Sequence, residues 1–256
     1  MKYQKILIAS LLLLISVVII DCFVPVSLGL YVGIILVTVG SLAYGSASIR
    51  SGLYTDVLWS VDSREKVIAL TFDDGPDEMV TPQVLDVLKK QHIQAAFFCK
   101  GSNVLRNPLL IERMDIEGHI VGGHSYSHHF LFDLFSMKGM VEELVKTEKL
   151  VQRVIRKKIR LFRPPYGVTN PTLAKALRKM NYHVIGWSLK SKDTVIKNEQ
   201  KLFERLIKKL GTADIILFHD TRRHMVPVLD KFITFAKEKN YRFERLDDIL
   251  HVEAYE

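Results

Sequence analysis

The sequence has too few cysteines for a disulfide framework. Only Cys22 and Cys99 occur in 256 residues, the first between two apolar stretches and the second at the end of the apolar run AAFFC. Cysteines in such surroundings are most often unreactive packing residues, and we predict this for both. The cysteine content therefore says nothing about the redox compartment of the protein.

Charged residues are absent from two long stretches near the N-terminus. Ile6–Ile20 and Val26–Ile49 contain no Lys, Arg, Asp or Glu. A helix needs about 20 apolar residues to cross roughly 30 Å of hydrocarbon. The second stretch exceeds this length, and the first reaches it when it is continued to Val24. Because Pro25 between them fits a tight turn, the pattern predicts two transmembrane helices joined as a hairpin.

The expected membrane anchor comprises residues 1–52 and contacts the lipid bilayer through residues 6–49. A cleaved signal peptide is the competing interpretation of the first stretch, but VIIDCFVPV offers no good small-x-small cleavage site. Flanking basic residues set the orientation: Lys2 and Lys5 precede the first span, the turn has none, and Arg50 follows the second. Two spans thus predict an integral protein of the cytoplasmic (inner) membrane with both ends inside. A single span would place the remaining chain outside.

Positive charge is in excess, but its distribution is not typical of a nucleic-acid-binding protein. The formal net charge is +8, from 36 Lys and Arg against 28 Asp and Glu. The basic residues are spread over segments such as 201–209 and 157–163, without interleaved aromatic residues. Such an excess suits a protein beside an anionic membrane surface. We predict no nucleic-acid partner, and the sequence carries no signal for an oligomeric state.

From about Leu53 onward, short apolar runs alternate with helical patterns, and no internal repeat occurs. The expected strands are 67–72, 95–99, 119–123, 160–162, 183–187, 214–218 and 241–246. Helices are expected after Thr81-Pro82, with Thr81 as the N-cap, after Asn170-Pro171, and over 203–210. This alternation predicts parallel strands in a single α/β domain, residues 53–256, arranged as a barrel or a doubly wound sheet.

Charged and histidine side chains follow the ends of several expected strands. Asp73 and Asp74, His124, Arg163 and His219 each come after an apolar run. The C-terminal ends of parallel strands form one edge of the sheet, where the active sites of α/β proteins gather. We therefore expect these side chains to converge.

Two of the motifs could form a metal site. His124 and His128 are four residues apart in HSYSH, a spacing that on a helical turn brings both imidazoles to one side. An oxygen of Asp74 would complete a set of three ligands and leave positions open for water and substrate, as a hydrolytic site requires. Taken alone, the sequence Asp-Gly-Pro would fit ordinary turn chemistry equally well.

The other two motifs supply a cation and an acid. Arg163 precedes two prolines in RPPYG, which fix its place, and it could hold a carboxylate in the ionised form. His219 ends the run DIILF and can act as a general acid near neutral pH. Each motif is weak alone, and the four in this order predict an enzyme active site.

The motifs TFDDGP, HSYSH, RPPYG and ILFHD resemble those of the polysaccharide deacetylases of carbohydrate esterase family 4, the NodB-homology domain, over about residues 66–250. The resemblance implies a distorted (β/α) barrel with fewer than eight strands. It also implies removal of N-acetyl groups from N-acetylglucosamine-type residues of a polysaccharide, peptidoglycan or chitooligosaccharide. One divalent metal ion is implied as cofactor, with zinc expected and cobalt, nickel or manganese as alternatives.

The resemblance also assigns roles to the residues that carry the reaction. Its metal ligands would be Asp74, His124 and His128. Asp73 would be the general base, and Arg163 would hold and tune it. His219 would be the general acid, and Asp193 would keep it protonated.

Three further residues would bind substrate, and two positions depart from the family pattern. The backbone N–H of Tyr166 would help to stabilise the oxyanion, Leu217 would line the acetyl pocket, and Trp187 would contact the sugar. Lys190 stands where an Asp is frequent, and Thr194 stands where a second Trp would be. These changes concern the shape of the groove and the choice of substrate, and leave the chemistry intact.

Two other functions remain open at this point. The hairpin favours a deacylase of a lipid-linked sugar precursor at the membrane face. A non-catalytic, membrane-anchored carbohydrate-binding domain is the alternative from a different class, and the complete set of acid, base and metal ligands argues against it.

Overall fold

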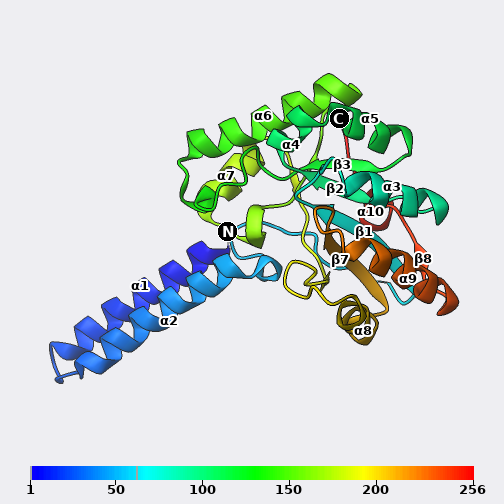
Figure 1. The fold of residues 1–256 in the computed structure, drawn as a ribbon. Coiled ribbons are helices and arrows are strands. Elements are labelled where there is room, and N and C mark those ends of the chain that lie inside the picture. The colour runs from blue at the N-terminus through cyan, green and yellow to red at the C-terminus, as the bar shows by residue number, and fades with distance from the viewer. Residues whose placement is uncertain (1, 62) are drawn as a thin grey trace.

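The computed structural model describes residues 2–61 and 63–256, so Met1, the first residue of the expected anchor, lies outside the described residues. Two long helices form a hairpin that projects from an α/β domain (Figure 1). They are α1 (Lys2–Asp21) and α2 (Leu28–Ala47). Both have the length and the apolar composition of a membrane span, and most of their large side chains are exposed. Spanning itself stays a prediction.

The turn of the hairpin is held by Asp21. Its carboxylate accepts hydrogen bonds from the Val26 N–H at 2.6 Å and from the Tyr31 hydroxyl at 3.2 Å. Between the helices, the Thr38 hydroxyl donates to the Ser10 hydroxyl at 2.8 Å. Cys22 is exposed at this turn, so the prediction of a packed cysteine is wrong there.

The domain is built on a parallel sheet, as predicted. Its row of strands runs β5-β4-β3-β2-β1-β7-β6, and the short β8 pairs with β1 outside the row. The strands are β1 (Val67–Asp73), β2 (Ala96–Cys99), β3 (Ile120–Gly123), β4 (Leu161–Phe162), β5 (His183–Val184), β6 (Leu189–Lys190), β7 (Ala213–His219) and β8 (Arg242–Phe243). The described residues thus form eight strands, where the resemblance implied fewer. The two-residue β6 was not anticipated.

The central strand β1 shows how the sheet separates core from site. Alternate side chains of a strand point to opposite faces. Ile68, Leu70 and Phe72 pack with the helices, whereas Val67 and Ala69 belong to a second core inside the curled sheet. All of these side chains are fully buried or nearly so. Thr71 and Asp73 continue the inner row toward the C-terminal end of the strand.

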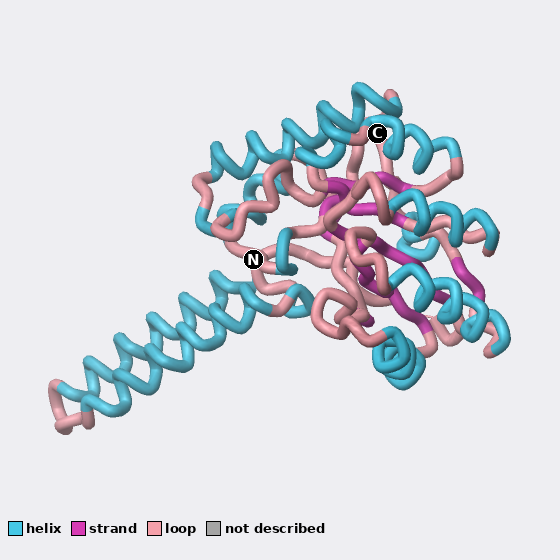
Figure 2. The backbone as a smooth tube through the Cα atoms, viewed as in Figure 1, coloured by secondary structure: helices cyan, strands magenta, loops and turns pink. Residues whose placement is uncertain are grey.

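Helices cover the outer face of the sheet (Figure 2). They are α3 (Thr81–Lys90), α4 (Gly101–Arg106), α5 (Pro108–Ile116), α6 (Met137–Ile155), α7 (Pro171–Lys179), α8 (Glu199–Lys209) and α9 (Met225–Glu238), with α10 (Leu246–Leu250) packed against the inner core. Short 3₁₀ turns are η1 (Ile49–Ser51), η2 (Phe132–Leu134) and η3 (Pro165–Gly167).

The helix-start predictions had mixed outcomes. Asn170 caps α7 as expected, because its side chain accepts a hydrogen bond from the Leu173 N–H at 2.8 Å. Thr81 is not the cap of α3, which begins at Thr81 after Val80. Its hydroxyl instead accepts from the Asp77 N–H and donates to the Asp220 carboxylate.

The segment that joins the hairpin to the domain, residues 45–54, is called the hairpin base below. Its Ser46 exchanges two hydrogen bonds with Thr169, one from its hydroxyl at 2.6 Å and one to its carbonyl at 3.1 Å. Arg50 donates to the carbonyls of Trp187 and Ser188. The hairpin base is therefore attached to two loops that follow sheet strands.

Candidate active site

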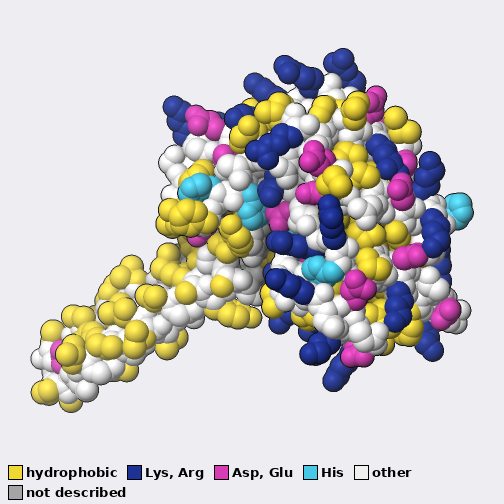
Figure 3. All heavy atoms as spheres, in the orientation of Figure 1, with side chains coloured by type: hydrophobic (Ala, Val, Ile, Leu, Met, Phe, Trp, Pro, Cys, Tyr) yellow, Lys and Arg dark blue, Asp and Glu magenta, His cyan; other side chains and the backbone are white. Residues whose placement is uncertain are grey.

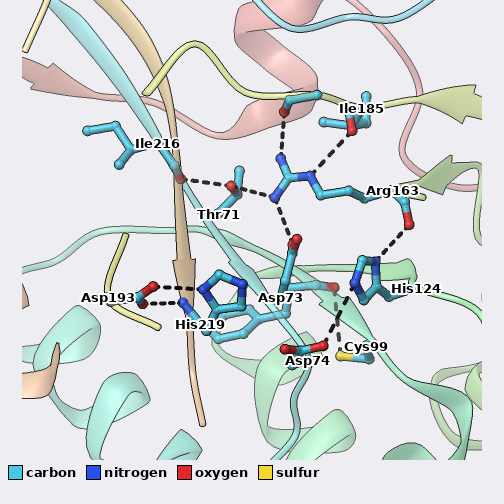
Figure 4. A network of polar contacts seen from close by, with 12 residues as sticks. Thr71, Asp73, Asp74, Cys99, His124, Arg163, Ile185, Asp193, Ile216 and His219 are labelled. Carbon is cyan, nitrogen blue, oxygen red and sulfur yellow. Dashed lines mark hydrogen bonds and ion pairs between the residues drawn. The ribbon is translucent and has the colours of Figure 1, made fainter. Parts of the chain in front are cut away.

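The predicted base and acid enter the site from neighbouring strands. β1 and β7 pair in register, Thr71 with Leu217 and Asp73 with His219. Because the pairing is parallel, both strands reach the C-terminal edge together, and the inner rows of the two strands lie side by side. Asp73 and His219 are both largely buried. The sequence prediction that these residues converge is confirmed, and Figure 4 shows the two side chains in one network.

Arg163 connects Asp73 to the inside of the sheet. Its fully buried guanidinium donates to the Asp73 carboxylate and to the Thr71 hydroxyl, both at 2.8 Å, and to the Gly186 carbonyl at 2.7 Å (Figure 4). It also lies over the Phe98 ring, 4.2 Å from the centroid. Burial lowers the pKa of Arg163 from its ordinary value, and the charge of Asp73 opposes that shift. The ion pair holds Asp73 in one orientation.

His219 is held by Asp193 at two points. The carboxylate accepts from the His219 backbone N–H at 2.7 Å and lies 2.8 Å from ring atom Nδ1. Burial lowers the pKa of His219, but the hydrogen bond and the charge of Asp193 outweigh it, so that the pKa is raised. This is the relation expected of a histidine that must carry a proton. Asp193 is fully buried and lies beside His219, as the family resemblance implied.

The three predicted metal ligands lie together. The ligand atoms of Asp74, His124 and His128 all fall within 4.8 Å of one another. Asp74 Oδ1 lies 3.8 Å from His124 Nε2 and 3.4 Å from His128 Nε2. The predicted reason was wrong, because residues 124–128 form a loop rather than a helical turn. The rings meet because Ser125 and His128 adopt positive φ angles of 58° and 52°.

The chemistry of this donor set fits a divalent cation. Asp74 Oδ1 is buried and has no hydrogen-bond partner among the described residues. His124 Nδ1 donates to the Arg163 carbonyl at 2.7 Å, which leaves the lone pair on Nε2, the atom that faces Asp74. Burial and the neighbouring His124 lower the pKa of His128 to about 4, so its imidazole is neutral at pH 7 and free to coordinate. A buried carboxylate oxygen and two imidazole nitrogens that face one another are the ligand types of a zinc site.

Tyr166 lies at the mouth of the same cleft. Its backbone has a φ of 60°, a strained value for a residue with a side chain. Tyr166 is 54% exposed, and its ring packs against that of His128 in a T-shaped contact with centroids 4.6 Å apart. The following Gly167 has a φ of 74°, and a Cβ there would lie 2.5 Å from the Trp187 ring. Glycine therefore allows the RPPYG loop to pack against Trp187.

Of the site residues predicted from the sequence, all except Arg163 and Asp193 line one cleft of about 370 Å³. Its lining consists of Asp73, Asp74, His124, His128, Tyr166, Gly167, Trp187, Lys190, Thr194, Leu217, His219 and Arg222. A larger cavity of about 600 Å³ lies near Lys2, Leu53 and Tyr182, and none of the predicted site residues lines it. The predicted catalytic and metal-ligating side chains therefore converge in the smaller cleft.

The chain is similar to known proteins over most of its length. Residues 60–185 match the model of the family described as polysaccharide deacetylase. A peptidoglycan-N-acetylglucosamine deacetylase of Bacillus cereus is 33% identical over 199 residues, which cover 76% of this chain and 92% of that protein. The chain belongs to the polysaccharide deacetylase family. Its active-site motifs are those of family 4 of the carbohydrate esterases, a group of enzymes that hydrolyse N-acetyl amide bonds.

Two further relatives show how far the similarity extends. The peptidoglycan-N-acetylmuramic acid deacetylase PdaA of Bacillus subtilis is 34% identical over 199 residues, covering 76% of this chain and 75% of that protein. The crystal structure of the Bc1960 peptidoglycan N-acetylglucosamine deacetylase superimposes with a TM-score of 0.74 and 27% identity, covering 85% of this chain and 99% of that one. The curled parallel sheet is thus the fold of this deacetylase family.

Three residues in or beside the deacetylase cleft were given no role from the sequence. Arg222 lines it from the turn after β7, yet in the sequence it is one of several basic residues outside any motif. Lys100 has its Nζ 3.9 Å from Asp74 Oδ1, and only its position directly after β2 could have indicated this. Asp220 is fully buried beneath Gly75, and a Cβ at Gly75 would collide with its carboxylate. Asp220 thus supports the turn that carries Asp74.

Proposed function

We propose that this protein is a membrane-anchored, metal-dependent deacetylase that removes N-acetyl groups from N-acetylglucosamine-type residues of an envelope glycan. One observation carries the proposal. A donor set suited to a divalent cation, Asp74, His124 and His128, lies in the same cleft as a paired carboxylate and a paired histidine, Asp73 and His219. The names of the relatives, which act on N-acetylglucosamine or N-acetylmuramic acid of peptidoglycan, support the substrate class.

The ligand set would bind a metal ion that acts as a Lewis acid. A divalent ion held by Asp74, His124 and His128 would polarise the amide carbonyl and lower the pKa of a water molecule, and zinc is the ion we expect. Asp73 is 2.8 Å from the Arg163 guanidinium, which holds it oriented toward the cleft as an acceptor. As general base, Asp73 takes one proton from the attacking water while the new C–O bond forms.

The breakdown of the tetrahedral intermediate needs an acid. His219, with its Nδ1 bonded to Asp193, presents its other ring nitrogen to the cleft (Figure 4). From there it protonates the sugar nitrogen as the C–N bond breaks, and acetate and a free amine are the products. The backbone N–H of Tyr166, at the strained φ of 60°, would stabilise the oxyanion before this step. Leu217 and Trp187 would form the walls around the acetyl group and the sugar.

The hairpin supports a second candidate substrate, a lipid-linked sugar precursor. The hairpin base is bonded to Thr169 and to the carbonyls of Trp187 and Ser188, in loops next to the cleft. If α1 and α2 span the bilayer as proposed, with residues 1–52 as anchor and residues 53–256 as catalytic domain, the cleft is held near the membrane surface. The flanking charges favour the cytoplasmic side, where a lipid-linked precursor would be within reach.

Acetate release by the purified full-length chain in detergent tests the proposal. The substrates are N-acetylglucosamine oligomers, assayed after removal of metal by a chelator and again after addition of Zn²⁺, Co²⁺, Ni²⁺ or Mn²⁺. We expect release that depends on the added ion. The variant Asp74→Ala should lose both bound metal and activity, because it lacks one of the three ligands.

Glu142→Gln is the matched control, since it also removes a carboxylate but from the exposed face of α6. It should bind metal and release acetate like the unmodified protein. Equal activity with and without metal would refute the metal dependence. A folded protein that binds neither metal nor oligomer would refute the enzymatic function.

A further inference from the structure

Two basic side chains stand at the rim of the deacetylase cleft. Lys190 and Arg222 line it together with the metal-ligand set and the candidate acid and base. In Figure 3, Lys and Arg side chains gather on the face of the domain that also shows histidine and acidic side chains. Neither Lys190 nor Arg222 has a role in the mechanism proposed above.

The fold directs Lys190 into the cleft. In β6 the preceding Leu189 is buried in the core that packs against the helices. Alternation along the strand then turns Lys190 to the inner face. Lys190 pairs in register with Leu217 of β7, and Leu217 and His219 are on the same face of that strand. The lysine therefore lies one strand away from the acetyl pocket.

Neither cation has an acidic partner in the part of the chain that the structure describes. Among residues 2–61 and 63–256, no Asp or Glu oxygen forms an ion pair with Lys190 or Arg222 at 4.0 Å or less. Of the carboxylates in or beside the cleft, Asp73 is paired with Arg163 and Asp193 with His219, and Asp74 belongs to the proposed metal-ligand set. The Lys190 ammonium lies over the Trp187 ring, 5.4 Å from its centroid.

We propose that the sugar unit bound in this cleft carries an anionic group close to its N-acetyl group, and that Lys190 and Arg222 recognise it. The inference rests on the proposed deacetylase function. When a substrate fills the cleft it displaces water, and a neutral sugar would leave both cations with less solvation and no counter-charge. A carboxylate or phosphate would compensate both of them.

Two kinds of amino sugar share this chemistry. In a muramic acid-type sugar, a lactyl ether beside the N-acetyl group ends in a carboxylate when it bears no peptide. In a lipid-linked or activated sugar, a phosphate is attached to the anomeric carbon on the other side of the N-acetyl group. Both sugars carry an anionic oxygen group on the ring carbon next to the one that bears the N-acetyl group. The experiment therefore includes one substrate of each kind.

The experiment compares kcat/KM for acetate release by the metal-loaded full-length chain in detergent. The substrates are a neutral N-acetylglucosamine oligomer, an oligomer of equal length that contains N-acetylmuramic acid with a free carboxylate, and the same oligomer with that carboxylate converted to a methylamide. A fourth substrate is a prenyl pyrophosphate-linked N-acetylglucosamine. We expect an anionic substrate to exceed its neutral counterpart by about 10-fold or more, the size of a charge-assisted hydrogen bond.

The variants Lys190→Met and Arg222→Gln should reduce this ratio toward one, chiefly by raising KM for the anionic substrate. Added salt should reduce it in the unmodified protein, since these contacts are partly exposed. Lys192→Met and Arg223→Gln are matched controls, because they remove exposed cations that are next to the pair in sequence and absent from the cleft lining. Both controls should keep the ratio.

The outcomes separate this inference from the proposed function. Preference for the free carboxylate identifies a muramic acid-type substrate, and preference for the pyrophosphate identifies the lipid-linked one. Metal-dependent release with equal kcat/KM for all four substrates overturns the inference and leaves the deacetylase function standing. A preference that survives in the Lys190→Met/Arg222→Gln double variant also overturns it. No release from any substrate overturns both.

Discussion

Asp73 and His219 are register partners on adjacent parallel strands, and each is fixed by a different buried group. Asp73 is bonded to Arg163, and His219 is bonded to Asp193. The pairing of β1 with β7 therefore sets the spacing between the candidate base and the candidate acid.

Loss of the base should reduce turnover strongly. In Asp73→Asn the side chain keeps its size but no longer accepts the proton of water, so we expect kcat to fall by about 10²–10⁴ with metal content unchanged. Acetate release and metal analysis of the purified variant measure this. Asp86→Asn, on the surface of α3, is the control and should behave as the unmodified protein. Full turnover in Asp73→Asn would remove that residue from the mechanism.

Loss of Asp193 should change the pH dependence. The hydrogen bond and charge of Asp193 raise the pKa of His219 against the lowering effect of burial. A general acid works in its protonated form, so kcat falls as the pH rises through this pKa. In Asp193→Asn the raising effect is lost, and the alkaline limb of the kcat profile should move to lower pH. An alkaline limb at the same pH as in the unmodified protein would contradict the role of His219.

Arg163 and Asp73, the ion pair inside the sheet, should be strongly coupled in their contributions to the free energy of unfolding. In Arg163→Met the Asp73 carboxylate remains buried without its cation, and the free energy of unfolding should fall by about 3–5 kcal/mol. The double variant Arg163→Met/Asp73→Asn has no uncompensated buried charge and should lose less stability than Arg163→Met alone. Denaturant unfolding of the four proteins gives the coupling energy. Additive losses would show that the pair does not interact energetically.

Asp220 should make stability depend on pH. Burial raises the pKa of its carboxyl from 3.8 to about 7, although the hydrogen bond from Thr81 opposes the shift. Between these two values the folded protein keeps a proton that the unfolded chain has lost, so this group's contribution to stability falls as the pH rises.

In Asp220→Asn that loss cannot occur, because the amide does not titrate. Compared with the variant, the unmodified protein should therefore lose stability between pH about 4 and about 7. Denaturant unfolding of both proteins at the two pH values is the measurement. Parallel pH profiles would show that Asp220 does not have a raised pKa.

The two cysteines allow a labelling test of topology. Cys22 is exposed at the hairpin turn, whereas Cys99 is fully buried and burial raises the pKa of its thiol well above the ordinary value. A membrane-impermeant maleimide should thus report on Cys22 alone. The flanking charges predict labelling of intact cells, with Cys22→Ser as the unlabelled control. Labelling only after permeabilisation would place the catalytic domain outside, next to the polymeric glycan.

Much of the site could be predicted because its residues follow long, regular strands. β1 and β7 are apolar runs of ordinary length, and their last residues are Asp73 and His219. Where the backbone is irregular, the prediction failed or succeeded for the wrong reason. The rings of His124 and His128 meet through two residues with positive φ, which spacing alone does not reveal.

Other features depend on contacts between distant segments. β6 has two residues, too few for a periodic pattern, and it exists because Lys190 and Leu189 pair with β7. Thr81 looks like a helix cap in the sequence, but its hydroxyl is used by Asp220, 139 residues later. Arg222 gave no signal because an exposed arginine in a turn is unremarkable until its neighbours in space are known.

The hydrogen bonds between the hairpin base and the loops beside the cleft also limit how far from the membrane the active site can act. Ser46 is bonded to Thr169 and Arg50 to the carbonyl of Trp187, so the base of the two helices is bound directly to loops of the catalytic domain. If the helices span the bilayer as proposed, the active site works at one fixed height above the lipid headgroups. Sugar units within that thin layer would be deacetylated, and identical units farther out would keep their acetyl groups. The spatial pattern of modification in the envelope would then be set by the geometry of residues 45–54.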